Sequence, residues 1–364
     1  MRRVVRVRHV WDDARREEVC MRALQVRRNG PPGEVCEVVE IPVPEPGPGV
    51  VRVRVAAGSL NFNDVDRCHG RTTSIPMKPP FTLGMDVCGV VDAAGAGGET
   101  WLGRRVVAIT QLAQGGLAEY ALAPLGSVFE APEGLDDAEA TSFLLPFHTA
   151  HLALFRRGKL AAGETLLVHS GASGLGTAAI QLGVAKGARV LATAGGPEKT
   201  KLCRELGAEL AIDHTREDFV TAVLDHTRDV GAHVICDLAG GDFVEKSWRC
   251  VAREGRYLCV GFADDPMNGF TGRPLRPSCP GNFSIVGVIL AYIDNLPSAI
   301  RRAGMNPFGR DVGDEVHADL LRLLREKQIR PVVGRRVALE DAGRALDDHE
   351  QRRTSGRTVV VIAA

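Results

Sequence analysis

The feature that most constrains this chain is an apolar run followed at once by a glycine-rich turn and a helical pattern, over residues 166–182. The run Leu166–Val168 has the length of a buried parallel strand. The helical spacing that follows is carried by four apolar residues, Leu175, Ala178, Ala179 and Leu182. The hydrophobic period therefore changes within a few residues, which predicts a strand, a tight turn and a helix in immediate succession.

The turn carries a variant of the dinucleotide fingerprint, in which Gly171 and Gly176 are kept and Ser173 replaces the middle glycine. A turn without bulky side chains leaves the first N–H groups of the following helix free to meet a pyrophosphate. The motif alone is also compatible with a turn that binds nothing. However, residues 188–193 form a second strand pattern after the helix, which completes a right-handed βαβ unit and favours a dinucleotide.

The end of that second strand predicts the phosphorylated coenzyme. NAD enzymes usually place a carboxylate here to bond the ribose hydroxyls. Residues 193–197 instead hold no Asp or Glu, and Lys199 opens the next helix, where it could neutralise a 2′-phosphate. A solvated lysine in the first turn is the alternative. We therefore expect NADPH rather than NADH.

Length, charge and cysteine usage exclude several classes of protein. The 364 residues are enough for two domains. The 45 basic and 45 acidic side chains balance, so no overall field attracts nucleic acid or a membrane surface. The nine cysteines are scattered without a CxxC pair, which is typical of reduced, intracellular proteins. No apolar run is long enough to cross a bilayer, and we expect a cytoplasmic protein that binds small molecules.

The chain changes pattern along its length. Residues 1–20 are interpreted as an N-terminal extension. From Met21 to about Pro124, short apolar runs alternate with Gly/Pro clusters, which predicts β structure, including a strand at 115–121. Helical spacing over 137–155 precedes alternating strands and helices to about residue 288, and the chain ends in two helices, near 313–327 and 340–349, and a strand at 357–362. The sequence thus predicts an α/β fold with a doubly wound parallel sheet and a mostly-β unit.

Several motifs in the same order as in a known family carry a resemblance that covers nearly everything after Met21. They span 58–64, 83–91, 115–120, 146–150, the nucleotide turn and 352–360. The chain resembles the zinc-free quinone oxidoreductase branch of the medium-chain dehydrogenase/reductase superfamily. The resemblance implies a GroES-like catalytic domain of residues 21–145 and 306–364, and a Rossmann dinucleotide-binding domain of residues 146–305.

The resemblance also bears on metals. Zinc-dependent members of the superfamily hold a catalytic metal at positions that match Asn61 and Met85, with a third near Leu145. These side chains are poor zinc ligands, so we expect no metal site. His148 and His151 could share one helical face, but without a third ligand nearby we interpret them as packing or capping residues.

The resemblance assigns candidate residues to both ends of the coenzyme. Asn61 would orient the nicotinamide or the substrate carbonyl, with a turn-bonded Asn as the equal alternative, and Asp64 would brace this catalytic loop. His214 would contact the ribose phosphate, with a surface histidine as the alternative. The full set of expected coenzyme contacts is Asn61, Thr149, Ala172, Ser173, Gly174, Leu175, Gly195, Lys199, His214, Val260, Gly261, Phe262 and Arg352.

The function implied is NADPH-dependent reduction of a quinone or another α,β-unsaturated carbonyl compound, by a protein without nucleic-acid or membrane partners that forms a homodimer as relatives do. Two alternatives remain open. One is an enoyl-thioester reductase. Asp66 and Arg71 argue against it, because similar proteins carry aromatic residues at these positions. The other is a nucleotide-binding protein without catalysis. The segments 263–283 and 301–312 are interpreted as loops or insertions beside the cleft.

Overall fold

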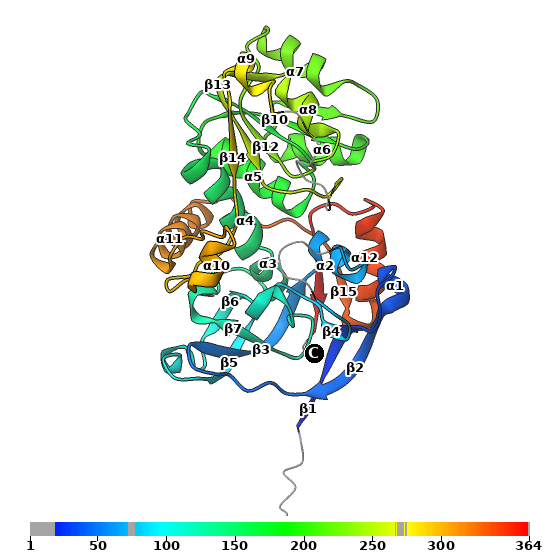
Figure 1. Ribbon diagram of the computed structural model, residues 1–364, viewed down its shortest axis with the longest axis vertical. Helices are drawn as coiled ribbons and strands as arrows, with labels where there is room; N and C mark the ends of the chain where they lie inside the picture. The colour runs from blue at the N-terminus through cyan, green and yellow to red at the C-terminus, as the bar shows by residue number, and fades with distance from the viewer. Residues whose placement is uncertain (1–18, 72–76, 266, 268–272, 274, 363–364) are drawn as a thin grey trace, which may run out of the picture.

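A computed structural model describes residues 19–71, 77–265, 267, 273 and 275–362, so the expected extension of residues 1–20 lies almost wholly outside the described residues. The chain forms two units stacked along the long axis of the molecule (Figure 1). One contains a six-stranded sheet and the other a seven-stranded and a three-stranded sheet. In the described part of the chain, no helix has the length and apolar character needed to cross a bilayer.

The six-stranded sheet is parallel throughout and confirms the predicted doubly wound fold. Its strands lie in the order β11 (Leu210–Asp213), β10 (Arg189–Ala194), β9 (Thr165–Val168), β12 (Ala232–Asp237), β13 (Val251–Cys259) and β14 (Ser284–Gly287). The chain therefore moves outward from β9 in one direction, returns, and moves outward in the other. The crevice at this reversal, between β9 and β12, is where such sheets bind ligands.

Helices cover both faces of this sheet because its central strand is apolar on both sides. Leu166 and Val168 of β9 share a core with α5 (Gly174–Ala185) and α6 (Pro197–Glu205). Leu167, between them, faces the opposite core with α7 (Phe219–Thr227) and α8 (Phe243–Trp248). The apolar run that predicted a buried strand is thus explained by two-sided burial.

The seven-stranded sheet combines strands from residues 50–130 with two strands from residues 333–361. Its order is β15 (Val333–Ala338), β16 (Arg357–Val361), β3 (Val50–Ser59), β5 (Asp86–Ala94), β6 (Arg105–Ile109) and β8 (Val128–Glu130), with β7 (Tyr120–Pro124) paired to β3. The three-stranded sheet has the order β2 (Cys36–Pro42), β1 (Cys20–Val26) and β4 (Phe81–Thr82). Because β16 pairs with β3, the chain returns after the six-stranded sheet to the unit that contains the seven-stranded sheet.

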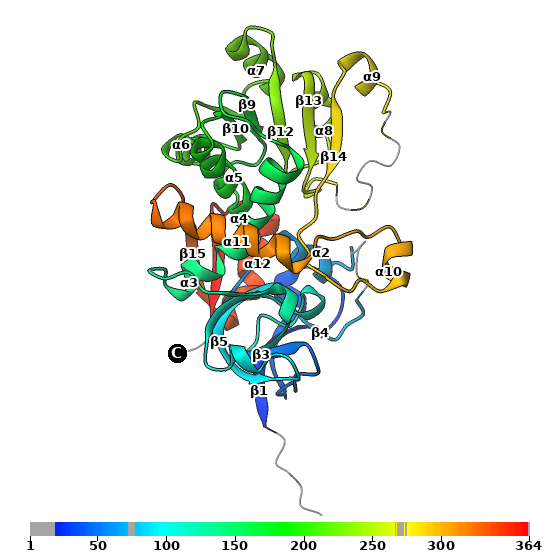
Figure 2. The same cartoon turned by 90° about the vertical axis from the view of Figure 1, so that its left-hand side faces the viewer.

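The remaining α-helices are α1 (Pro32–Val35), α2 (Phe62–Cys68), α3 (Asp137–Thr141), α4 (Leu144–His151) continued by a π-helix (Leu152–Arg157), α9 (Ser278–Gly281), α10 (Ser298–Arg302), α11 (Arg310–Arg325) and α12 (Ala342–Glu350). Among them, α9 packs on β13 at the far end of the six-stranded sheet, whereas the others cover the unit with the seven-stranded sheet or lie where the two units meet (Figure 1). Figure 2 shows α11 running across the junction of the two units, close to α4.

One expected strand is wrong in its bounds, and another strand was not predicted. The expected strand at 115–121 begins only at Tyr120, because Gly115 has φ +84° and the residues before Tyr120 pair irregularly with the backbone of 22–24 and 82–84, leaving only an isolated bridge between Ala118 and Ala23. Strand β15 was not predicted, since four of its six residues are exposed and it lacks an apolar alternation. The stretch 301–312, interpreted as an insertion, contains the end of α10 and the start of α11.

Candidate functional site

The glycine-rich turn joins β9 to α5 as expected. Ser173 is the N-cap of α5, and its Oγ accepts a hydrogen bond from the Gly176 N–H at 3.0 Å. A Cβ on Gly176 would lie 2.2 Å from the Ser170 carbonyl oxygen, so this position requires glycine. The helix supplies no acceptor for the N–H groups of Gly174 and Leu175, which can therefore meet an anion.

The end of the chain, from the other unit, is seated on this turn. The Gly356 N–H donates to the Ala172 carbonyl oxygen at 2.8 Å, and Ser173 bridges Gly356 in parallel register. A Cβ on Gly174 would lie 2.2 Å from Cδ of Arg357. The absence of a side chain at Gly174 thus lets Arg357 pass directly beside the turn.

Asn61, at the N-cap of α2, belongs to a buried network with Asp86 and Arg357. Its Nδ2 donates to Asp86 Oδ1 at 2.7 Å and to the Ser59 carbonyl oxygen at 3.2 Å, while its Oδ1 accepts from Arg357 Nη1 at 2.9 Å. Arg357 Nη2 also donates to Asp86 Oδ2 at 2.7 Å. Since Arg357 can only donate, the amide orientation is fixed, and both N–H groups of Asn61 are used within the protein.

Arg357 and Asp86 form an ion pair with almost no solvent contact, their side chains being 7% and 1% exposed. Burial raises the pKa of the Asp86 carboxyl, and the Arg357 guanidinium opposes this shift. The Nε–H of Arg357 is buried and has no hydrogen-bond partner within the described residues. An unpaired buried donor beside a predicted pyrophosphate turn fits an anionic ligand.

Asp64, in the same loop as Asn61, accepts hydrogen bonds from two backbone N–H groups. Its Oδ2 accepts from the Asn61 N–H at 2.9 Å and its Oδ1 from the Gly84 N–H at 3.2 Å. It is fully buried, and burial raises the pKa of its carboxyl while Arg67, at 3.9 Å, opposes the shift. These contacts tie the start of α2 to the chain before β5, so Asp64 braces the loop that holds Asn61.

The positions matched to zinc ligands are engaged in other contacts. Met85 Sδ accepts from Asn63 Nδ2 at 3.4 Å, and Leu145 is a half-buried residue of α4. His148 is fully buried, with Tyr292 Oη 3.0 Å from its Nδ1 and His317 Nδ1 3.1 Å from its Nε2. Over the part of the chain that the structure describes, no three His, Cys, Asp or Glu side chains gather as a metal would require.

Lys199 and Arg352 lie together at the expected adenosine end. Lys199, in the first turn of α6, donates from Nζ to the Arg352 carbonyl oxygen at 2.5 Å. Burial, and then the Arg352 charge, lower the pKa of Lys199. Among the described residues, no carboxylate lies within ion-pair distance of its Nζ. A half-buried lysine without a counter-ion, beside an arginine, fits a phosphate.

His214 and Gly195 also meet here, since a Cβ on Gly195 would lie 3.5 Å from Nε2 of His214. The His214 ring packs edge-on against Phe243, with centroids 5.2 Å apart. The structure adds a carboxylate that the sequence analysis did not expect at this tip. Asp213, at the end of β11, accepts from the Gly196 N–H at 2.9 Å and from the Thr215 hydroxyl, so its charge is already bound by the loop.

The expected nicotinamide end lies at the carboxyl end of β13. The N–H groups of Val260 and Gly261 both donate to the Asp237 carbonyl oxygen at 3.1 Å, which holds this turn against β12. Phe262 follows and is partly exposed. Thr149, on α4, is buried and donates from Oγ1 to the Leu145 carbonyl oxygen at 2.6 Å. Its hydroxyl oxygen can still accept a hydrogen bond from a ligand.

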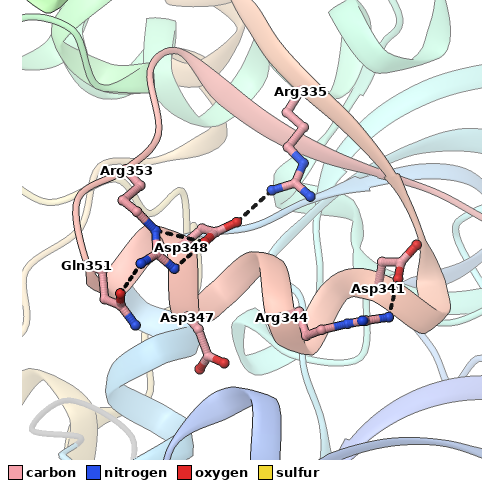
Figure 3. A pocket seen from close by; sticks show the side chains of 7 residues that line it. All are labelled: Arg335, Asp341, Arg344, Asp347, Asp348, Gln351 and Arg353. Carbon is pink, nitrogen blue, oxygen red and sulfur yellow. Dashed lines mark hydrogen bonds and ion pairs between the residues drawn. The ribbon is translucent and has the colours of Figure 1, made fainter.

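An open cavity on α12 and the residues that follow it is lined by none of the expected coenzyme contacts. It has a volume of about 490 Å³ and is lined by Arg335, Asp341, Arg344, Asp347, Asp348, Gln351 and Arg353 (Figure 3). Each of its three arginines already pairs with a neighbouring aspartate. This cavity therefore offers no uncompensated positive charge to a phosphate.

Two residues of the central network, Asp86 and Arg357, were not predicted from the sequence. Both lie inside motifs that were recognised, at the start of β5 and at the start of β16. Nothing local marks them as partners, because they are 271 residues apart in the chain. An Asp within an otherwise apolar strand and an Arg at the entry to another were the available signals.

Comparisons with known proteins agree with this geometry. The family described as alcohol dehydrogenase GroES-like domain matches residues 47–133, and that described as zinc-binding dehydrogenase matches residues 174–304. A quinone oxidoreductase of Pseudomonas aeruginosa is 30% identical over 293 residues, 78% of this chain and 82% of the relative.

Two solved structures illustrate the likeness of the whole fold. The quinone oxidoreductase of Pseudomonas syringae has a TM-score of 0.81 at 26% identity, covering 94% of this chain and 99% of that one. The quinone oxidoreductase of Thermus thermophilus, which has also been solved in complex with NADPH, has a TM-score of 0.72 at 32% identity, covering 94% and 100%.

Proposed function

Because this chain belongs to the quinone oxidoreductase branch of the medium-chain dehydrogenase/reductase superfamily, we propose that it reduces quinones or other α,β-unsaturated carbonyl compounds with NADPH and without a catalytic zinc ion. The coenzyme would supply a hydride from its nicotinamide. Such substrates accept hydride without a Lewis acid, because the charge that develops is delocalised onto a carbonyl oxygen.

The observation that carries the choice of coenzyme is the contact between Lys199 and Arg352. Beyond the end of β10, Lys199 Nζ donates to the Arg352 backbone carbonyl oxygen, and burial followed by the Arg352 charge lowers the pKa of Lys199. Among the described residues no carboxylate pairs with this lysine. A 2′-phosphate would neutralise charge there that NADH would leave unpaired. Asp213 does not oppose this, since its carboxylate is bound by the Gly196 N–H and Thr215.

The hydrogen bonds of Asn61 support a role in positioning the coenzyme. Both of its N–H groups are used, so this side chain can serve a ligand only as an acceptor, through Oδ1, which already accepts from Arg357 and faces the backbone N–H of Asp64 in the capping box of α2. We infer that Asn61 accepts a hydrogen bond from the nicotinamide amide or a ribose hydroxyl and thereby positions the ring. The proton that completes the reduction then comes from water or from another group.

Independence from zinc rests on the side chains at the matched positions. Asn61 is committed to Asp86 and Arg357, and Met85 presents a thioether, which is a weak ligand for Zn²⁺. Elemental analysis of the purified protein should therefore recover less than a stoichiometric amount of zinc, and prolonged chelation should leave turnover unchanged.

Turnover of a small quinone compared with a crotonyl thioester tests the substrate class. We expect NADPH oxidation with the quinone at a much higher kcat/KM than with the thioester, because Arg71 and Asp66 stand where thioester reductases and similar proteins carry aromatic side chains. The reverse preference would favour the enoyl-thioester alternative. Tight NADPH binding without turnover of either substrate would favour a non-catalytic nucleotide-binding protein.

A further inference from the structure

Arg352, an expected coenzyme ligand, is engaged by a carboxylate of the protein itself. Its guanidinium forms an ion pair with Asp264, on the loop after β13, and Nη2 lies 3.4 Å from the Ala263 carbonyl oxygen. The two partners belong to different parts of the chain: Arg352 follows α12 and Asp264 follows β13. Their side chains are 49% and 27% exposed, so the pair can open without disrupting a core.

This ion pair lies at the wall of a cavity on the ligand-binding edge of the parallel sheet. The cavity has a volume of about 420 Å³ and is lined by Gly241, Asp242, Ala263, Asp264, Asp265, Arg273 and Arg352. Its walls are the loops that follow β12 and β13, joined by the hydrogen bond from the Asp264 N–H to the Ala239 carbonyl oxygen at 2.8 Å. Ligands of doubly wound sheets bind at these carboxyl ends.

The charges around the pair are incompletely matched on both sides. Lys199 adds a second positive charge near Arg352. Burial, and then the charge of Arg352, lowers the pKa of Lys199. Asp264 lies near Asp237 and Asp242, and burial together with these carboxylates raises its pKa, although Arg352 and His214 oppose the shift. The Asp264–Arg352 pair thus leaves Lys199 without a counter-ion and holds Asp264 near two other carboxylates, Asp237 and Asp242.

A phosphate group would match this arrangement better than Asp264 does. It carries more than one acceptor oxygen and up to two negative charges, so it can bridge Lys199 and Arg352 together. Arg352 would then exchange its carboxylate partner for the phosphate, and Asp264 would be released to solvent.

We propose that Asp264 is an internal competitor for the coenzyme phosphate, and that its ion pair with Arg352 limits coenzyme affinity. The inference rests on the proposed function, since it requires that a phosphorylated dinucleotide binds at this edge. The inference goes beyond that function because Asp264, which is not itself a coenzyme ligand, would limit the affinity for the coenzyme. The phosphate concerned is either the 2′-phosphate or the pyrophosphate.

The test is a double-mutant cycle on the protein without substrate, with the dissociation constants of NADPH and NADH measured by calorimetry. The variants are Asp264→Asn, Arg352→Gln and the double variant. Asp265→Asn is the matched control, because Asp265 lines the same cavity and carries the same charge but pairs with Arg273 at 3.7 Å. We expect Asp264→Asn to tighten NADPH binding roughly two- to fivefold, the range of an exposed ion pair.

Asp265→Asn should change the affinity less than Asp264→Asn does, and Asp264→Asn should have no effect once Arg352 is Gln. A gain for NADPH alone assigns the exchange to the 2′-phosphate, and an equal gain for NADH assigns it to the pyrophosphate. Equal effects of the two Asn variants, or an effect of Asp264→Asn that persists with Arg352→Gln, would overturn the inference while the proposed function stands. A wild-type protein that binds neither dinucleotide would overturn both.

Discussion

Arg357 is the residue on which the two parts of the site converge. Its guanidinium bonds both Asn61 and Asp86, and its aliphatic stem fills the space left by Gly174. Removing one partner of a buried ion pair leaves the other charge uncompensated, which is far more costly than removing the whole pair. We therefore expect both stability and coenzyme binding to depend on this side chain.

Arg357→Met should lower the free energy of unfolding by roughly 3–5 kcal/mol, as measured by urea denaturation, because Asp86 is left buried without a counter-ion. Adding Asp86→Asn should recover part of the loss. Arg344→Met is the control: this arginine is 79% exposed beside Asp341 and should cost no more than about 1 kcal/mol. Equal losses in the two single variants would contradict the assignment.

Lys199→Gln should weaken NADPH binding roughly tenfold or more while leaving NADH binding nearly unchanged, because a hydrogen bond to a charged group contributes about 1.5–3 kcal/mol. Titration of each coenzyme against the substrate-free protein provides the measurement. Lys201→Gln is the matched control on the same helix, since Lys201 is 69% exposed and pairs with Glu205. A similar loss for both coenzymes would show that Lys199 does not read the 2′-phosphate.

At the scale of elements, the nucleotide turn depends on the close approach of β16. Gly174→Ala should push Arg357 away, because its Cβ would lie 2.2 Å from Cδ and 2.9 Å from Cγ of that side chain. We expect coenzyme affinity to fall about tenfold, on the order of one lost charge-assisted contact. Gly287→Ala, in β14, meets no atom within 4 Å and should leave the affinity unchanged. An unchanged affinity in Gly174→Ala would mean that Arg357 is free to shift.

Helices α4 and α11 are joined by a buried chain of polar rings. Tyr292 and His317 flank His148, and His317 Nε2 lies 3.1 Å from the Glu130 carbonyl oxygen. Because that oxygen only accepts, His317 Nε2 carries a proton. With both rings neutral, as their lowered pKa values indicate, each donates onward from Nε2. Burial lowers the pKa of His317 to about 4 and that of His148 well below 6.5, with Arg310 and, for His148, the neighbouring His317 and His151 adding to the shift.

These shifts predict a loss of stability in mild acid. The unfolded imidazoles bind protons below about pH 6.5, whereas the folded His317 does so only near pH 4. The free energy of unfolding should therefore have its full value above about pH 6.5. It should fall as the pH is lowered from 6.5 to 4, by roughly 1 kcal/mol per pH unit for each histidine. His317→Asn should flatten this slope in urea titrations, and His226→Asn, at the surface beside Glu209, should not. Equal slopes in all three proteins would refute the assignment.

What the sequence could predict is set by the range of the interactions concerned. Strand β9, the turn and α5 were predicted because their signals are local. The apolar periodicity, the glycines of the turn and the N-cap Ser173 all lie within about 17 consecutive residues. Asn61 and Arg352 were found through motifs. The pairs Asp86–Arg357 and Asp264–Arg352 could not be found, since each joins residues far apart in the chain and no local pattern specifies the partner.

At the scale of the whole molecule, the two units meet along the predicted coenzyme crevice through polar contacts. Gly356 bonds Ala172, and Gln181 of α5 exchanges two hydrogen bonds with the backbone of Arg330 at 2.8 and 3.0 Å. The chain end also delivers Arg352 to Lys199. A dinucleotide that lies across this line contacts both units, so its binding energy stabilises their association as well as the turn.

NADPH should therefore slow backbone hydrogen exchange in two segments that are far apart in the sequence, residues 171–176 and residues 351–358. At a coenzyme concentration of about 100 times Kd, the added protection corresponds to about 2.7 kcal/mol where exchange requires release of the ligand. Strand β2, which lies in the three-stranded sheet, is the internal reference and should change least. Protection confined to the turn, with none in 351–358, would mean that the chain end takes no part in holding the coenzyme, and both Arg352 and Arg357 would lose the roles inferred for them.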